Sequence, residues 1–223
     1  RYNDNGQLVR YVDPEGNIDF YEYYTSGPMK DYLYRITRDE GGEGIVNRYE
    51  YDAVGNVTGI YDGKGNKTAF VINQVNQIME TIARSPFNYR VKMRYNENTK
   101  LVKTEIEIKD KDGNLDSNMP WIATEYDYNL LDKLTSRTEQ ISGSETISTT
   151  YGYDKNGNMD LYTQPLLNKI KRSYDERNLL FETIRGYDTA DWTSTKLFYD
   201  INGNLEKMID GRGNETEYLI DDF

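Results

Sequence analysis

The sequence predicts an all-β fold, a repetitive antiparallel ribbon of about 18–20 short strands. Three observations lead to this prediction: the residue types, an internal repeat, and the alternation of side chains between the turns. The 223 residues include 21 Tyr but only 6 Phe and 2 Trp. Tyr, Thr and Ile favour strands, whereas the plentiful Gly, Asn and Asp favour turns. The length allows one large domain or two small ones.

A seven-residue template recurs along the chain. It consists of an aromatic or aliphatic residue, Asp or Asn, two free positions, a turn residue, one free position and an apolar residue. Copies begin at Tyr2, Tyr23, Tyr51, Ile72, Tyr95, Tyr128, Tyr153, Tyr174 and Tyr199, and Ile220 begins a tenth. A second turn starts 11 residues after several of these positions, at residues 13–17, 62–66, 164–168 and 210–214. We therefore expect residues 1–223 to be about ten tandem copies, truncated at both ends, without a separate catalytic domain.

The Asp-x-x-Gly core of the template predicts a bulged hairpin turn. Asp is expected to accept hydrogen bonds from backbone N–H groups two or three residues on, and Gly to supply the left-handed φ. Asn76, Asp132 and Asn178 replace Gly and tolerate that conformation, whereas Thr99 predicts a different turn. The structural positions predicted from the repeat are Tyr2, Gly6, Asp13, Gly16, Tyr51, Asp52, Gly55, Asp62, Gly65, Tyr95, Tyr128, Tyr153, Asp154, Gly157, Tyr174, Asp175, Tyr199, Asp200, Gly203, Asp210 and Gly213.

Between the turns the chain alternates with a period of two. Thr68, Phe70 and Ile72 share one face of a predicted strand, as do Thr216, Tyr218 and Ile220. The repeated tyrosines are expected to stack from strand to strand. Two longer intervals between copies predict extended hairpins, with tips at residues 40–44 and 109–114.

The repeat resembles the RHS/YD repeat. The pattern Tyr-Asp-x-x-Gly-Asn-Leu, then Asp-Pro-x-Gly-Asn, then Thr-x-Tyr carries this resemblance, most clearly from Tyr2 to Phe20 and from Tyr199 to Tyr218. The resemblance implies a β-ribbon that is curved or spirals into a hollow shell, of which this chain would form a partial shell. The family includes bacterial polymorphic toxins, the cocoon components of insecticidal Tc toxin complexes, and animal teneurins. In the bacterial members the shell encloses a cytotoxic C-terminal segment.

Composition argues against several other classes of protein. A net charge of −11 disfavours nucleic acids and anionic membranes as partners, and no apolar run is long enough to span a bilayer. Without His or Cys, the Ser-His-Asp and Cys-His catalytic arrangements are excluded. The pairs Glu105/Glu107 and Asp221/Asp222 could be proposed as catalytic carboxylates, but nothing distinguishes them among 38 acidic residues. Residues 109–116 lack the spacing of a calcium loop. We expect no catalytic, cofactor or metal site.

The sequence therefore predicts a structural protein, a wall segment of an encapsulating shell. Its expected partners are the flanking repeats of the same polypeptide and an enclosed C-terminal toxin or other cargo segment. Cell-surface adhesion, with binding of carbohydrate or protein by the tyrosine-rich surface, is the alternative. By the family resemblance, a bacterial secreted or cell-surface location is expected. Edge strands near Tyr2–Tyr11 and Glu215–Ile220 also predict edge-to-edge self-association.

Overall fold

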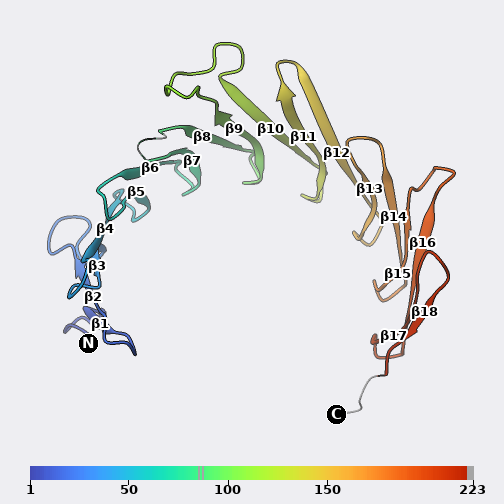
Figure 1. Ribbon diagram of the computed structural model, residues 1–223, viewed down its shortest axis with the longest axis horizontal. Coiled ribbons are helices and arrows are strands. Elements are labelled where there is room, and N and C mark those ends of the chain that lie inside the picture. Colours follow the sequence, from blue (N-terminus) through green and yellow to red (C-terminus); the bar gives the residue numbers. More distant parts are fainter. Residues whose placement is uncertain (85, 87, 220–223) are drawn as a thin grey trace. The chain divides into compact units, whose positions relative to one another are not determined.

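The computed structural model describes residues 1–84, 86 and 88–219, and within them the regular elements are 18 strands joined by turns and hairpin loops (Figure 1). The predicted all-β fold is thus confirmed. The strands are β1 (Arg10–Val12), β2 (Ile18–Tyr23), β3 (Leu33–Arg38), β4 (Ile45–Tyr51), β5 (Val57–Tyr61), β6 (Lys67–Ile72), β7 (Ile78–Ile82), β8 (Arg90–Tyr95), β9 (Leu101–Glu107), β10 (Trp121–Tyr128), β11 (Leu134–Ser142), β12 (Glu145–Tyr153), β13 (Met159–Thr163), β14 (Lys169–Tyr174), β15 (Leu180–Arg185), β16 (Thr193–Tyr199), β17 (Leu205–Ile209) and β18 (Glu215–Glu217). The predicted tenth copy at Ile220 and the pair Asp221/Asp222 lie outside the described residues.

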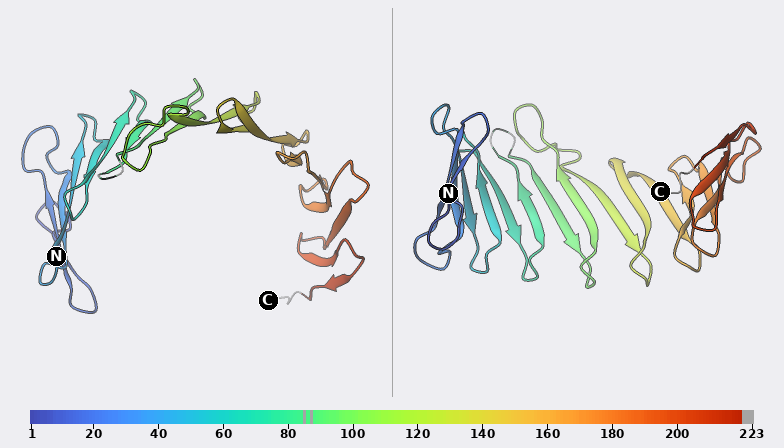
Figure 2. Two further views of the ribbon diagram at one scale, coloured as in Figure 1. Left: turned by 45° about the horizontal axis from the view of Figure 1, so that its top comes forward. Right: turned by 90° about the horizontal axis from the view of Figure 1, so that it is seen from below.

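The chain divides into two compact units. Unit 1 contains Arg1–Tyr95 and Lys103–Ala123, and unit 2 contains Asn96–Val102 and Thr124–Phe223. In unit 1, β1 to β8 pair antiparallel, each strand with the next along the chain. In unit 2 the same rule holds from β10 to β18. Successive hairpins of each unit lie side by side in Figures 1 and 2.

A register shift recurs just after the template turn. Between β4 and β5, Glu50 lies opposite Gly59 but Tyr51 lies opposite Val57, which leaves Thr58 as an extra residue. This is a β-bulge, and it is expected where a type I turn is followed by a left-handed residue. The corresponding extra residues elsewhere are Tyr34, Met79, Thr135, Asp160, Phe181 and Glu206.

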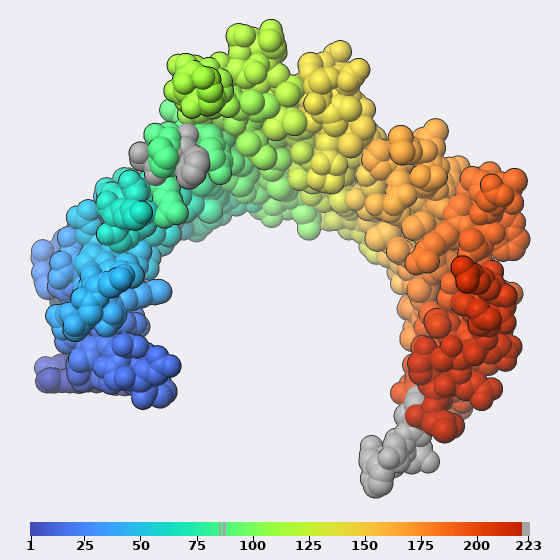
Figure 3. All heavy atoms as spheres, in the orientation of Figure 1, coloured from blue at the N-terminus to red at the C-terminus, as the bar shows by residue number. Residues whose placement is uncertain are grey.

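Each unit is a single layer of strands without a covering layer, as the space-filling view also shows (Figure 3). The accessible surface is 15450 Å², whereas a compact protein of 26.0 kDa would expose about 10,500 Å². Among the described residues, three are buried: Ile36 (8% exposed), Gly59 and Thr149 (6%). The fold is therefore stabilised by contacts along and between neighbouring strands rather than by a central core.

The two faces of the sheet in unit 1 differ in chemistry. Register and alternation place one group of side chains on one face, which we call the tyrosine face: Tyr21, Ile36, Asn47, Tyr49, Ile60, Thr68, Phe70, Thr81 and Val91. The opposite face, which we call the charged face, carries Glu22, Arg35, Arg48, Glu50, Lys67, Glu80 and Lys92. The predicted shared face of Thr68 and Phe70 is confirmed by their partners Ile60 and Thr81.

Unit 2 has the same two faces. Its tyrosine face carries Tyr126, Arg137, Thr149, Tyr151, Tyr162, Ile170, Thr183, Thr195, Leu197, Met208 and Thr216. Its charged face carries Asp160, Lys171, Glu182, Lys196, Lys207, Glu215 and Glu217. The tyrosine face of unit 2 also carries charged residues. Arg137 is paired with Glu139 at 2.6 Å on the same strand, and Arg172 and Arg185 lie opposite Thr183 and Ile170.

Both predicted hairpin tips are present in unit 1. Residues 39–44 close the β3–β4 hairpin, where the Gly44 N–H donates to the Asp39 carbonyl at 2.9 Å. The second tip closes over an antiparallel bridge between Lys109 and Leu115. The copy that begins at Tyr23 departs from the template, because its loop runs from Tyr24 to Tyr32 and the two are joined by an N–H to carbonyl bond of 2.9 Å. Tyr24 stands where other copies have Asp or Asn, so this loop lacks the side chain that closes the short turn.

Candidate functional site

The repeated turn is held together by the aspartate side chain. In the turn that starts at Asp52, one carboxylate oxygen accepts the backbone N–H groups of Val54 and Asn56 at 3.0 and 2.9 Å, and the other accepts the Asn56 side-chain amide at 2.8 Å. The sequence predicted donors two or three residues on. The second donor lies four residues on instead, because the N–H of Gly55, three residues on, donates to the Asp52 carbonyl at 3.1 Å.

The same arrangement recurs wherever the motif is complete. Asp13, Asp62, Asp154 and Asp210 each accept N–H groups from residues two and four positions on. The hairpin tip at Asp110 has the same bonds. The asparagine after each glycine returns its side-chain amide to the aspartate, which explains the recurring Gly-Asn pair.

Glycine fills the left-handed position of these turns as predicted. The φ angles of Gly6, Gly16, Gly55, Gly65, Gly157, Gly203 and Gly213 lie between 76° and 97°. The predicted substitutes are also left-handed: φ is 62° at Asn76, 58° at Asp132 and 64° at Asn178. Leu167, in the second turn without Asp or Gly, adopts a φ of 64° as well. A leucine pays a steric penalty in this conformation.

The expectation of a different turn at Thr99 is wrong. Thr99 has a φ of 64°, and its N–H donates to the Asn96 carbonyl at 3.0 Å as in the other turns. The Asn96 side chain also accepts the Lys100 N–H at 2.9 Å. The asparagine therefore imposes the common turn on a residue that does not itself favour it.

Hydrogen bonds in the turns hold the pKa values of eight aspartates below the ordinary 3.8. For Asp13, Asp52, Asp200 and Asp210 the largest cause is the asparagine side chain four residues on. For Asp62 and Asp110 it is the backbone N–H of that asparagine. For Asp154 and Asp175 desolvation is the largest single cause and raises the pKa, but the hydrogen bonds together outweigh it.

The template tyrosines make a contact that the sequence did not predict. Each hydroxyl donates to a backbone carbonyl of the preceding copy, at 2.8 to 3.0 Å. The seven pairs are Tyr23 with Leu8, Tyr51 with Leu33, Tyr95 with Ile78, Tyr128 with Leu101, Tyr153 with Leu134, Tyr174 with Met159, and Tyr199 with Leu180. In six of the seven pairs the acceptor is the apolar residue that ends the preceding template. In the copy that begins at Tyr23, whose loop is longer, the acceptor is Leu33, which precedes the bulge residue Tyr34. Tyr2 belongs to the first copy, and its backbone forms an isolated antiparallel β-bridge with Leu8.

This contact ties three strands together. Tyr153, for example, lies on β12, is opposite Met159 on β13, and donates to Leu134 on β11. Burial raises the pKa of Tyr153 above the ordinary 10.0, and it does the same for Tyr23, Tyr51, Tyr128 and Tyr199. The protonated hydroxyl is thus the form that the fold retains.

Ring stacking between tyrosines is less regular than the sequence predicted. Tyr151 and Tyr162 on neighbouring strands are in contact, with ring centroids 5.6 Å apart. Tyr24, Tyr32 and Tyr51 form a second cluster, in which the Tyr32 and Tyr51 centroids are 5.0 Å apart. In the part of the chain that the structure describes, none of the ring contacts joins two template tyrosines, whose shared feature is the hydroxyl bond.

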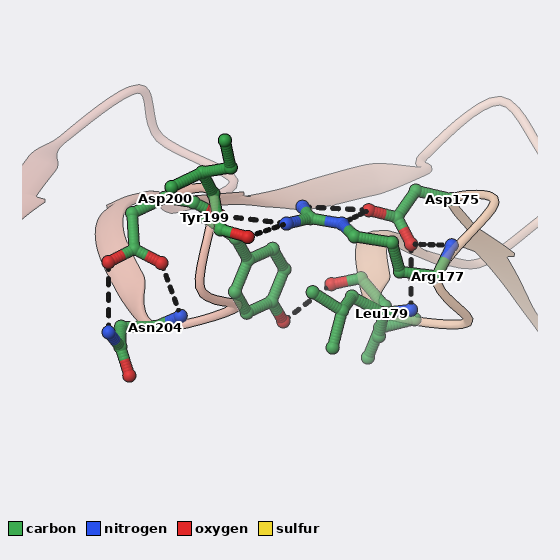
Figure 4. A network of polar contacts seen from close by, with 8 residues as sticks. Asp175, Arg177, Leu179, Tyr199, Asp200 and Asn204 are labelled. Carbon is green, nitrogen blue, oxygen red and sulfur yellow. Dashed lines mark hydrogen bonds and ion pairs between the residues drawn. The ribbon is translucent and has the colours of Figure 1, made fainter.

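Figure 4 shows how neighbouring template turns meet. Asp175 accepts the N–H groups of Arg177 and Leu179 at 2.9 Å each. The Arg177 guanidinium binds Asp175 and also donates to the carbonyl of Asp200, in the next template turn, at 2.8 Å. Within unit 2, side chains therefore reinforce the backbone ladder along the edge where the template turns lie.

The carboxylates considered for catalysis are engaged in ion pairs. Glu105 binds Arg94 at 3.2 Å and Lys103 at 3.4 Å, and Glu107 binds Lys109 at 3.0 Å. Among the described residues no group of three or more acidic side chains lies close enough to hold a metal ion. Nor does this part of the chain contain a helix long and apolar enough to cross a membrane. The candidate functional features of the described residues are therefore the repeated turns and the two faces of the sheet.

No protein-family model matches the sequence, and no curated protein matches it. Solved structures do match. The structure titled TcdB2-TccC3 without hypervariable C-terminal region superposes with a TM-score of 0.60 over 99% of this chain, at 12% identity. The chain has the fold of a TcdB2-TccC3 segment. It spans only 13% of that much longer chain. TcdB2-TccC3-TEV and the Photorhabdus luminescens Tc holotoxin pore also match, at 12% and 13% identity over 96% of this chain, but with TM-scores of 0.44 they add no argument.

Proposed function

We propose that the chain is a wall segment of a hollow β-shell that encloses a toxin or other cargo segment of a bacterial secreted or cell-surface protein. The observation that carries this proposal is the single-layer sheet with two chemically different faces. One face presents mostly neutral and aromatic side chains over many strands, and these side chains are half-buried although no second layer covers them. The TcdB2-TccC3 likeness supports the same role, because the matching segment belongs to a much larger chain.

In this proposal the charged face lies outside and the tyrosine face lies inside. Ion pairs cover the charged face, among them Glu50–Lys67 at 2.5 Å and Asp160–Lys171 at 2.7 Å. Exposed pairs of this kind add little stability, about 0–1 kcal/mol each, but they keep a surface hydrated. The tyrosine face holds Ile36 and Thr149, the two buried residues other than Gly59 among those that the structure describes. It suits contact with an enclosed polypeptide better than contact with water.

Cysteine labelling tests both the enclosure and the orientation. The chain has no Cys, so Thr195→Cys and Lys196→Cys place single thiols on opposite faces at adjacent positions of β16. In the complete protein, a maleimide on a polymer of several kilodaltons should label the Lys196→Cys thiol and spare the Thr195→Cys thiol. Equal labelling of both would refute enclosure, and the reverse pattern would refute the orientation. A small maleimide, which enters the interior, controls for the reactivity of each thiol.

Recognition of an external ligand is the second candidate function. One observation favours it: the tyrosine face of unit 1 has a hollow of about 540 Å³ lined by Asn47, Thr68, Thr81, Tyr89 and Val91, among others. Amides, hydroxyls and an aromatic ring are the groups that commonly bind sugars. Saturating binding to a glycan array, lost on Asn47→Ala and Thr81→Val, would favour this function over the shell.

A further inference from the structure

Template turns are joined in pairs by an asparagine amide. The Asn56 side chain has two N–H groups, and it uses one for Asp52 of its own turn and the other for Oδ1 of Asn76 in the next template turn, both at 2.8 Å. In unit 2, Asn158 does the same, with 3.1 Å to Asp154 and 2.8 Å to Asn178. Each pair therefore satisfies the full donor capacity of one amide.

In two further pairs the donor is the asparagine two positions earlier in the donor turn. Asn98 donates to Asp132 at 3.1 Å. In the first pair, Asn5 lies 3.5 Å from the Asp31 carboxylate, and Gln7 donates to the Asp31 carbonyl at 2.8 Å. The donor turns belong to the first, third, fifth and seventh copies, and the acceptor turns to the second, fourth, sixth and eighth.

The four acceptors share an unusual backbone. Asp31, Asn76, Asp132 and Asn178 are all non-glycine residues with positive φ, at 71°, 62°, 58° and 64°. Glycine is the residue that fits this conformation without strain, and it fills the equivalent position in most donor turns. Glycine, however, has no side chain that could accept a hydrogen bond. The acid or amide at this position thus supplies a hydrogen-bond acceptor, which the left-handed conformation alone does not require.

We infer that these four residues lock each even-numbered template turn to the turn before it through a side-chain acceptor at the left-handed position. The division into compact units is consistent with this, since every pair lies within one unit. The inference concerns the repeat itself and does not depend on the proposed shell function.

The test uses Asn76→Gly in the full chain, with Leu167→Gly as the matched control. Both residues are left-handed, with φ of 62° and 64°, so glycine relieves backbone strain at both sites. Only Asn76 accepts a bond from a neighbouring template turn. Amide hydrogen exchange of Val54 and Asn56, whose N–H groups bind Asp52, reports on the partner turn.

We expect Asn76→Gly to speed exchange of the Val54 and Asn56 amides about fivefold, as loss of one hydrogen bond allows. Leu167→Gly should leave these amides unchanged and slow exchange in its own turn. In the Asn76→Gly background, Asn56→Ala should cause no further change in amide hydrogen exchange of the turn formed by residues 73–76. Unchanged or slower exchange at Val54 and Asn56 in Asn76→Gly would overturn the inference, because the residue would then be a tolerated substitute for glycine.

Discussion

The tyrosine hydroxyl contact can be tested by removing a single oxygen atom. In Tyr153→Phe the ring stays on the tyrosine face, but the 2.8 Å hydrogen bond to the Leu134 carbonyl is lost. A hydrogen bond of this kind contributes about 1 kcal/mol net, and the half-buried carbonyl keeps partial access to water, so we expect a loss of about 1 kcal/mol. That corresponds to roughly a fivefold change in the local opening equilibrium.

Tyr151→Phe is the control, because Tyr151 lies two residues away on the same strand and face, and its hydroxyl makes no hydrogen bond to the described residues. Repeat arrays depart from two-state unfolding, so amide hydrogen exchange across the β11–β12 ladder is the better assay. Exchange should accelerate in Tyr153→Phe and stay near the wild-type rate in Tyr151→Phe. Equal effects of the two substitutions would refute the role assigned to the hydroxyl.

The pH dependence gives a second readout of the same contact. Burial raises the pKa of Tyr153 above 10.0 in the folded state, so as the pH increases the unfolded chain loses this proton first. The contribution to stability is therefore complete below pH 10 and is lost as the pH rises toward the folded pKa. Denaturant titration at each pH checks this. Between neutral pH and this alkaline range, the free energy of unfolding should fall less for Tyr153→Phe than for the wild type.

Three other predictions concern the turns and the edges. Leu167→Gly should stabilise the chain by about 0.5–1 kcal/mol, because glycine adopts the positive φ without strain; thermal melts showing a lower midpoint would contradict this. Asp200→Asn should keep the melting temperature near that of the wild type at pH 7, since Asn73 holds an equivalent turn, whereas Asp200→Ala should lower it. The wild type should lose the Asp200 contribution as the pH falls below 3.8, because the folded pKa is lowered, and Asp200→Asn should lack this loss. Sedimentation at rising concentration should show self-association through the edge strands, and a strictly monomeric chain would refute it.

The sequence predicted the turns well because their chemistry is local. Asp52, Gly55 and Asn56 lie within five residues, and the hydrogen bonds among them follow from residue type. Thr99 was mispredicted because the judgement rested on its own preference, whereas the Asn96 side chain and the backbone bonds decide the turn.

The contacts between copies could not be read in the same way. The acceptor of the Tyr153 hydroxyl is a main-chain carbonyl, which has no sequence signature, and its position depends on the bulge that follows Leu134. The interval from the tyrosine to its acceptor varies from 15 residues (Tyr23 to Leu8) to 27 residues (Tyr128 to Leu101), so no fixed spacing marks the acceptor in the sequence. The Asn56–Asn76 bond likewise depends on two turns being neighbours in space.

The absence of a central core has a consequence for how the protein resists proteases. Because each strand contacts little beyond its two neighbours, cutting one hairpin removes the support of the adjacent strands but not of distant ones. Damage would then spread stepwise from a nick or a frayed end, and digestion would yield a ladder of fragments instead of sudden collapse. The tyrosine hydroxyl bonds join successive copies, so neighbouring fragments in the digest would differ in length by about one copy.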